Sequence, residues 1–233
     1  MPSVWLAVAV GSVAAYQLTF FGGVKLAGVA LGTAVGIGSA PLWGGLVDGV
    51  FLGWRPSRRW LVAAAIALVG VALVAGEPGD AENPALGLLL AVGAGASYAL
   101  YAFALQRLTQ GADADHVAAS VFTRAAILLL PVLLIGDAGE LLTGRGAAMS
   151  LHLGIIATTL SYALFTRGVR DTPVSTATLL SLAEPLTAVV LGVLVVDEVL
   201  EPAAVVGVAL LLAGVSLAAT ASRPRRRGSR LRA

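Results

Sequence analysis

The sequence predicts an all-α protein, a polytopic transmembrane helical bundle of about eight spans. Hydrophobic residues make up 58% of the 233 residues and charged residues only 12%, whereas an ordinary soluble domain carries about 25% charged residues. The mean hydropathy is +0.91. The apolar residues are gathered in long segments, and a helix needs roughly 20 such residues to cross a bilayer core about 30 Å thick. A chain with so little charge cannot cover a surface that faces water.

Eight segments meet this length requirement. Short charged or turn-forming connections such as WRPSRR, GEPGDAENP and RGVRDTP separate them. The opening MPSVWLAVAV has no basic residue before its apolar stretch, unlike a secretory signal peptide, so we interpret it as the first membrane helix. In chain order we expect spans over residues 3–22, 27–52, 59–76, 84–107, 116–135, 149–167, 173–197 and 202–221.

Basic residues predict the orientation of these spans, because short cytoplasmic loops are enriched in Lys and Arg. With the C-terminal tail placed inside, the alternation of spans puts twelve of the fifteen basic residues on the cytoplasmic side. We therefore expect a multi-pass protein of the cytoplasmic (inner) membrane with both termini in the cytoplasm. The twelve are Arg55, Arg58, Arg59, Arg107, Arg167, Arg170, Arg223, Arg225, Arg226, Arg227, Arg230 and Arg232.

Residues 28–75 match residues 172–219 at a constant offset of 144, which indicates an internal repeat. Nine positions are identical, among them Pro41 with Pro185 and Gly70 with Gly214. The connection after the second span is basic, whereas the one after the seventh contains Asp197, Glu198 and Glu201. Two similar helix pairs with opposite loop charge are expected to insert upside down relative to each other. Inverted repeats of this kind are typical of secondary transporters.

Four stretches of the sequence resemble parts of a known transporter family. LAEPLTAVVLGVLVVDE followed by GVALLLAGVSL resembles the end of the second repeat of the EamA-type drug/metabolite transporters. SAPLWGGLVDGVFLG followed by GVALVAG resembles the same part of the first repeat. GASYALYAFALQRL and HVAASVFTRAAILLLP, with Arg124, resemble the helices that open the second repeat.

The resemblance implies a ten-helix inverted-repeat transporter fold of which this chain is a remnant. Residues 1–76 would be an incomplete first repeat of three helices, residues 84–221 a second repeat of five, and residues 222–233 a basic cytoplasmic tail. The family's glutamate at the end of the proline-containing helix corresponds to Glu198, and the first repeat has Trp54 there. Whether Met1 is the true start, or two helices precede it, is left open.

Glu184 and Pro185 stand together near the middle of the seventh span. An ionised carboxylate at that depth is costly unless it is paired or reaches water. Because Pro185 has no N–H, we expect the carbonyl of Ser181 to be free. Thr178 and Ser181 precede Glu184 at spacings of three, so we expect their hydroxyls to share its helix face. The alternative is that Glu184 stays protonated and bonds a neighbouring helix.

Further candidate site residues lie on other spans. We expect Tyr16, Tyr98, Tyr101, Tyr162 and Trp43 to line an aqueous cavity around Glu184, which would bind substrate or protons. Arg124 lies inside a span and would either reach back to the interface or pair with a carboxylate or substrate.

Three remaining expectations concern structure rather than substrate. Pro41 and Pro185 are expected to kink their helices. Asp48 is expected to form an interfacial ion pair with Arg55 or Arg58. Glycines at spacings of four, as at Gly28 and Gly32, predict close helix packing and a possible homodimer.

These observations favour a secondary transporter, an exporter of small metabolites or drugs. The alternative is a truncated, non-transporting membrane protein or a subunit that needs a partner. No nucleophile or ATP-binding motif indicates an enzyme or a primary pump. No cofactor or metal is expected, since the chain has no cysteine and two histidines. The expected partners are the lipid bilayer and an unknown small-molecule substrate, and no nucleic acid.

Overall fold

The structure is a computed structural model that describes residues 3–76, 81–135, 139, 143–196 and 201–221. The described residues form helices joined by short connections, with no strand among them, as the sequence predicts. The tail 222–233 and the acidic residues Asp197 and Glu198 lie outside the described residues. The helices are α1 (Ser3–Ala27), α2 (Val29–Leu52), α3 (Arg58–Ala75), α4 (Pro84–Thr109), α5 (Ala114–Ile135), α6 (Gly144–His152), the π-helix η2 (Leu153–Leu160), α7 (Ser161–Val169), α8 (Val174–Leu180), α9 (Ala183–Val196) and α10 (Pro202–Ala221).

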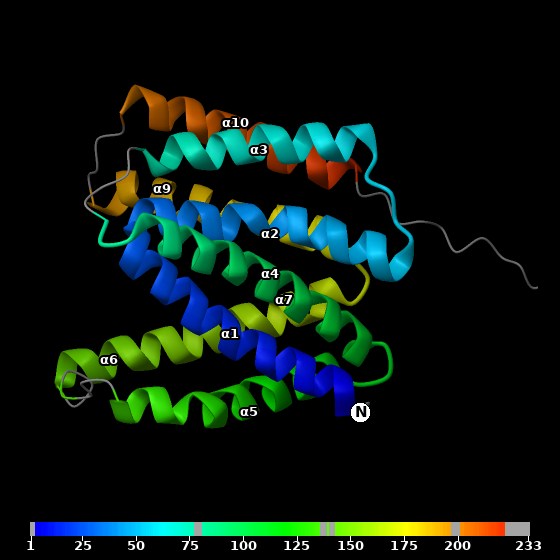
Figure 1. Cartoon of the computed structure of the whole chain (residues 1–233), viewed down its shortest axis with the longest axis vertical. Helices are drawn as coiled ribbons and strands as arrows, with labels where there is room; N and C mark the ends of the chain where they lie inside the picture. Colours follow the sequence, from blue (N-terminus) through cyan, green and yellow to red (C-terminus); the bar gives the residue numbers. More distant parts are fainter. Residues whose placement is uncertain (1–2, 77–80, 136–138, 140–142, 197–200, 222–233) are drawn as a thin grey trace, which may run out of the picture.

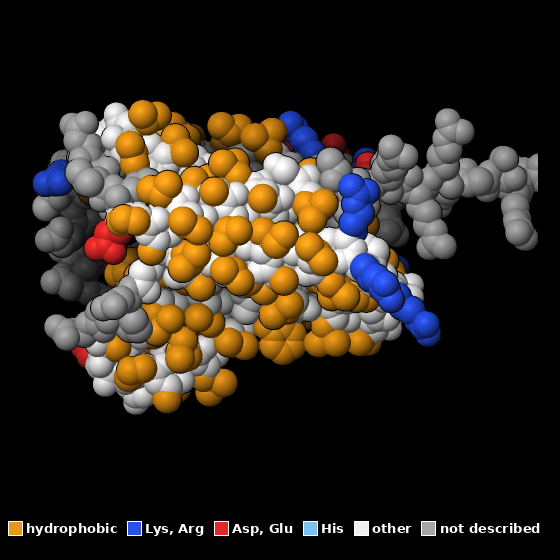
Figure 2. Space-filling view, turned by 90° about the horizontal axis from the view of Figure 1, so that it is seen from above, with side chains coloured by type: hydrophobic (Ala, Val, Ile, Leu, Met, Phe, Trp, Pro, Cys, Tyr) orange, Lys and Arg blue, Asp and Glu red, His pale blue; other side chains and the backbone are white. Residues whose placement is uncertain are grey.

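Within the described residues, eight helical segments are long and apolar enough to cross a membrane, which confirms the predicted spans. The sixth span is the continuous series α6, η2 and α7 over Gly144–Val169, longer than the predicted 149–167. The seventh span is not one helix, because it is divided into α8 and α9. Orange apolar side chains cover the flank in Figure 2, and most of the visible Lys and Arg lie at its right-hand end.

Successive spans run in opposite directions, so α1 begins and α10 ends at the same end of the bundle (Figure 1). The α2–α3, α4–α5 and α7–α8 connections lie at this end as well, which we call the terminal end. Helices α1, α2 and α4 pack together in the centre of the molecule, and α3 lies along α10 at its edge.

The α3–α10 pair is held by reciprocal glycine contacts. A Cβ at Gly70 would lie 2.7 Å from the nitrogen of Leu211 and 2.8 Å from the carbonyl oxygen of Gly207. A Cβ at Gly214 would lie 2.7 Å from the nitrogen of Ala67 and 2.9 Å from the carbonyl oxygen of Ala63. The two sets of contacts correspond, because adding 144 to the residue numbers of Gly70, Ala67 and Ala63 gives Gly214, Leu211 and Gly207. Two equivalent patches in mutual contact are what a two-fold relation between antiparallel helices produces.

The terminal end of the bundle is densely packed. Phe103, Leu105 and Leu108 of α4 are almost completely buried there, against apolar side chains that include Val117 of α5 and Val174 of α8. Burial of large apolar side chains on several helices closes this end by shape as well as by hydrophobicity.

Two polar contacts also join α2 and α3 to α8 at the terminal end. The carboxylate of Asp48, fully buried in α2, accepts a hydrogen bond of 2.8 Å from the backbone N–H of Ser175 at the start of α8. The indole Nε1–H of Trp60 donates to the carbonyl of Ser175 at 3.3 Å. The predicted ion pair of Asp48 is therefore wrong. Its carboxylate accepts from a backbone N–H in the first turn of α8, which has no partner within its own helix, and does not pair with Arg55 or Arg58.

Candidate functional site

The break in the seventh span creates the polar centre of the molecule. Helix α8 ends at Leu180 and α9 begins at Ala183, and Ser181 and Leu182 form a turn between them. The N–H of Glu184 donates to the carbonyl of Ser181 at 2.9 Å. The expectation of a free Ser181 carbonyl is therefore wrong, because the tighter turn brings the N–H three residues later within reach of it.

Hydroxyl side chains support this local geometry. Thr178 donates to the carbonyl of Val174 at 2.9 Å, and the Ser181 hydroxyl lies 3.0 Å from the carbonyl of Ala177. Side chains that bond the carbonyl four residues earlier compete with the helix's own hydrogen bonds and often bend it. Pro185 then occupies the first turn of α9, where a missing N–H costs little. Pro41, in contrast, lies inside α2 without interrupting that helix.

A cavity of about 500 Å³ opens beside the break. Its lining comes from five spans: the first, second, fourth, sixth and both parts of the seventh. Most of the lining residues lie near mid-span or on the side away from the terminal end. They are Tyr16, Gly36, Ile37, Ala40, Tyr98, Ala157, Ser161, Tyr162, Phe165, Leu180, Ser181, Ala183, Glu184 and Thr187.

Glu184 is the charged residue among these lining residues. Its side chain is exposed to the cavity and has no hydrogen-bond or ion-pair partner within the part of the chain that the structure describes. The alternative in which Glu184 bonds a neighbouring helix therefore finds no support in this conformation. A carboxyl group without a partner, in the middle of a membrane span, requires water, a proton or a ligand cation.

Three tyrosines line the cavity together with Glu184. The Tyr98 hydroxyl lies 2.8 Å from that of Ser181, which joins α4 to the break. Tyr16, Tyr98 and Tyr162 all lie within electrostatic range of Glu184. Four predicted residues besides Glu184 thus line the cavity together: Tyr16, Tyr98, Tyr162 and Ser181.

Aromatic rings form much of the cavity wall. The ring of Tyr98 lies 5.6 Å from that of Phe165 and 6.0 Å from that of Tyr16, measured between centroids. Tyr162 and Phe165 are in edge-to-face contact at 6.3 Å. Such pairs stabilise defined ring orientations. The wall therefore has a fixed aromatic surface with hydroxyl groups on it.

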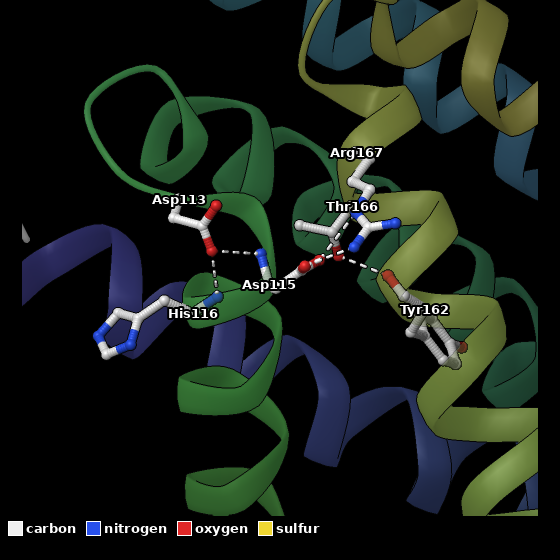
Figure 3. Close-up of polar contacts among 6 residues, drawn as sticks. All are labelled: Asp113, Asp115, His116, Tyr162, Thr166 and Arg167. Atoms are coloured by element: carbon white, nitrogen blue, oxygen red, sulfur yellow. Dashed lines mark hydrogen bonds and ion pairs between the residues drawn. The ribbon is translucent and has the colours of Figure 1, made fainter.

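The position of Tyr162 depends on contacts at the terminal end of α7 (Figure 3). Arg167 donates from its Nε to the carboxylate of Asp115 at 2.9 Å, which ties α7 to the start of α5. Thr166 donates to the carbonyl of Tyr162 at 2.6 Å. Asp113 accepts from the N–H of His116 at 3.0 Å and caps α5. These contacts hold the helix that carries Tyr162 and Phe165.

Four predicted residues lie outside the cavity lining. Thr178 is fully buried and faces α2, where a Cβ at Gly44 would come within 2.5 Å of its hydroxyl. Tyr101 is buried among the rings of Phe122, Tyr162 and Phe165. Trp43 packs against the same apolar core. Arg124 is exposed and donates to the carbonyl of Ser120 at 2.9 Å, one turn nearer the terminal end.

The correction for Thr178 has a simple physical reason. Spacing of three places Thr178, Ser181 and Glu184 on one face only if the helix is continuous. The turn at Ser181–Leu182 rotates α9 relative to α8, so Glu184 and Ser181 reach the cavity while Thr178 packs between helices.

Sequence reasoning missed Phe165 and Thr187, which both line the cavity. Each lies three residues after a predicted site residue, Tyr162 and Glu184 respectively, so the helical period was a usable signal. The π-helix η2 was not predicted, although it supplies Ala157. Thr159 donates to the carbonyl of Gly154, five residues earlier, at 2.7 Å. Hydroxyl contacts of this kind accompany the wider turn, and π-helices often occur at functional sites.

Within the described residues, no group of three or more His, Cys, Asp or Glu side chains is arranged to hold a metal ion. The chemistry that the cavity offers is therefore that of one carboxyl group, several hydroxyls and aromatic rings.

Comparison with known proteins decides the family. A family model described as the EamA-like transporter family matches residues 85–220, more than half of the chain. The chain belongs to the EamA-like transporter family. As a member, it is a multi-pass membrane transporter.

Relatives in other organisms carry transporter names. The chain is 40% identical over 222 residues to the "Uncharacterized transporter YwfM" of Bacillus subtilis (strain 168), covering 95% of this chain and 74% of the relative. It is 28% identical over 219 residues to a "Probable terminal-alkyne amino-acid exporter" of Streptantibioticus cattleyicolor, covering 93% of this chain and 72% of that protein.

A solved crystal structure, described only as that of a protein, has the same fold. It superposes with a TM-score of 0.79 at 21% identity, covering 96% of this chain and 78% of the solved chain. The fold of this EamA-like chain is therefore one that has been observed experimentally.

Proposed function

We propose that this EamA-like protein is a secondary exporter of small metabolites or drugs, and that Glu184 is its substrate- or proton-binding group. One observation carries the proposal: the carboxyl group of Glu184 lies without a protein partner at mid-span, in a cavity of about 500 Å³. That volume falls in the range of sites for small molecules. The amino-acid exporter among the relatives supports small metabolites as the size class.

The packing of the two ends supports alternating access. The terminal end is closed by apolar side chains and by the Asp48–Ser175 contact. Cavity residues such as Gly36 and Thr187 lie instead on the side away from it. We propose that both termini lie in the cytoplasm of an inner-membrane protein, and in that orientation this conformation faces outward. An exporter must also adopt the opposite state, in which the terminal end opens.

The internal repeat supplies the two-state element. We propose that residues 1–76 and 84–221 are two repeats that rock against each other around α3 and α10, with residues 222–233 as a cytoplasmic tail. The reciprocal contacts of Gly70 and Gly214 support this pivot. Alternating access by one repeat moving against another is the usual mode of such folds.

The test is flux through the purified protein in liposomes under an imposed pH gradient, with a panel of labelled small metabolites. Glu184→Gln keeps the size of the side chain and removes its charge. We expect the substrate flux to fall by about tenfold or more, and the remaining flux to lose its dependence on pH. Glu82→Gln is the matched control, because Glu82 is exposed in the α3–α4 connection. Unchanged flux in the Glu184→Gln protein would remove Glu184 from the mechanism.

A second candidate function rests on the uncovered flank of the cavity. Helix α4 packs against α1 and α2, the third and fourth helices of the proposed first repeat. Among the described residues, no helix packs against both α7 and α9 in the way that α4 packs against α1 and α2. In addition, the most apolar 18 residues of the span α6–η2–α7 include no buried residue. An uncovered flank of this kind is one that a partner or a second copy can cover, so we propose as the second candidate a subunit that works with such a partner. Flux from protein shown to be monomeric by light scattering would exclude it.

A further inference from the structure

We propose that the cavity selects organic amines that carry a single positive charge and no anionic group. The inference rests on the proposed function, since it takes the cavity around Glu184 to be the substrate site. It assigns a chemical class to that substrate from the charges, helix ends and rings that surround the cavity.

Charge is the first argument. Glu184 is an acidic residue, and the other lining residues are uncharged. Two arginines of the neighbouring spans have other partners: Arg124 is exposed and bonds Ser120, and Arg167 pairs with Asp115. An ammonium group beside Glu184 would neutralise it, whereas a carboxylate or phosphate would meet like charge without a cation to offset its desolvation.

The broken helix removes the usual alternative, an anion site at a helix N-terminus. Free N–H groups and the helix dipole make such an end attractive to carboxylates. At the start of α9, however, Pro185 has no N–H, and the N–H of Glu184 already donates to the carbonyl of Ser181 at 2.9 Å. The carboxyl group of Glu184 itself stands in the first turn. The end of α9 that reaches the cavity is therefore unsuited to an anionic ligand.

The aromatic wall supplies the remaining recognition. Tyr16, Tyr98 and Tyr162 line the same cavity as the carboxyl group of Glu184, together with Phe165, whose ring lies 5.6 Å from that of Tyr98. Ring faces attract cations within about 6 Å. Hydroxyl oxygens accept hydrogen bonds from an ammonium group. The apolar part of the ligand would pack on Ile37, Ala40 and Leu180.

These features disfavour zwitterions as well as anions. An α-amino acid would gain the same ammonium contact, but its carboxylate would lie within a few ångströms of Glu184, with hydroxyls as its available partners. Repulsion between like charges in a site of low dielectric constant opposes that arrangement. The cavity should therefore prefer an amine to the amino acid with the same side chain.

The test compares four probes of one shape with the full chain in lipid nanodiscs, by isothermal titration calorimetry at pH 7.5. The probes are 2-phenylethylamine, phenylalanine, 3-phenylpropionate and 2-phenylethanol. We expect the amine to bind at least tenfold more tightly than each of the others. In the Glu184→Gln protein that preference should disappear, while the control Glu82→Gln should keep it.

Three results would overturn the inference: phenylalanine or 3-phenylpropionate binding as tightly as the amine, no measurable binding of the amine, or a preference that survives in Glu184→Gln. A loss of preference caused by misfolding is separated by a substitution outside the cavity lining. Ala188→Leu changes an exposed residue of the same helix and keeps Glu184, so that variant should retain the preference for the amine. Selective amine binding without flux in liposomes would count against the exporter function alone, and flux of anions without amine selectivity would count against this inference alone.

Discussion

The two proline-containing spans, α2 and α8–α9, are matched by the 144-residue offset but have different structures. Pro41 lies within a continuous helix, and its neighbour Ala40 is an almost fully buried, uncharged part of the cavity lining. Pro185 follows a break, and its neighbour Glu184 faces the cavity without a partner among the described residues. A proline in a membrane helix therefore does not by itself decide whether the helix is interrupted.

The surroundings of each proline account for the difference. On the α8 side, Thr178 and Ser181 bond carbonyls of their own helix, and Asp48 of α2 accepts from the N–H of Ser175 in the first turn of α8. Helix α8 is thus fixed at its own start independently of α9. Helix α2 has no such division and packs along α4 and α8. The span with Pro41 is thus a continuous helix, and the span with Pro185 carries the charged group of the cavity.

The largest expected effect is at Gly44, where α2 meets α8. In Gly44→Ala the new Cβ would lie 3.1 Å from the Cα of Ser175 and 2.5 Å from the Thr178 hydroxyl. Because backbone atoms must shift, we expect a loss of about 3 kcal/mol of stability, the upper end of the usual cost of overpacking. Thermal unfolding in detergent measures it.

The matched position in α9 is the control for Gly44. The residue 144 positions later is Ala188, which already carries a Cβ and is exposed. Enlarging it further in Ala188→Leu should therefore change stability by no more than about 0.5 kcal/mol. Equal losses in the two proteins would show that α2 and α9 are packed alike and would remove the contrast.

A smaller effect is expected at Asp48. In Asp48→Ala the buried N–H of Ser175 loses its acceptor, which should cost about 2 kcal/mol, the penalty of an unsatisfied buried donor. Asp48→Asn keeps an acceptor oxygen and should lose less. Hydrogen exchange at Ser175 reports the contact directly.

Asp113→Ala provides the comparison for Asp48, since Asp113 makes a similar cap at the exposed start of α5. It should lose less stability than Asp48→Ala because water can replace the lost acceptor. A larger loss at Asp113 would contradict the view that the buried contact of Asp48 holds α2 against α8.

The smallest effects are expected at the prolines themselves. Pro41→Ala restores one backbone hydrogen bond inside a continuous helix and should add about 1 kcal/mol. Pro185→Ala is in a first turn, where the N–H has no helical partner, and should change stability by no more than about 0.5 kcal/mol. Denaturation in mixed micelles distinguishes the two, and a loss of more than about 1 kcal/mol in Pro185→Ala would show that the proline stabilises the break.

Much of the fold followed from local features of the sequence. The number of spans depends on the length of the apolar segments, and each of the eight predicted segments corresponds to a helical span of the structure, the seventh being divided into α8 and α9. The break in the seventh span could not be placed, because it depends on whether hydroxyls at Thr178 and Ser181 bond their own helix or a neighbour. The site was predictable in part: Glu184, Ser181 and three tyrosines line the cavity. Phe165 was missed, although it follows Tyr162 by three residues.

The sequence by itself determined that the chain is an all-helical membrane protein with a carboxyl group at mid-span, since hydrophobic length and the cost of a buried charge are properties of each segment alone. Only the tertiary structure decided what each polar side chain faces. In the structure, Asp48 accepts from the N–H of Ser175, Arg124 donates to the carbonyl of Ser120, and Thr178 packs against Gly44. The physical reason is that periodicity defines a helix face but not the neighbour that covers it, and the neighbour is chosen by packing between helices.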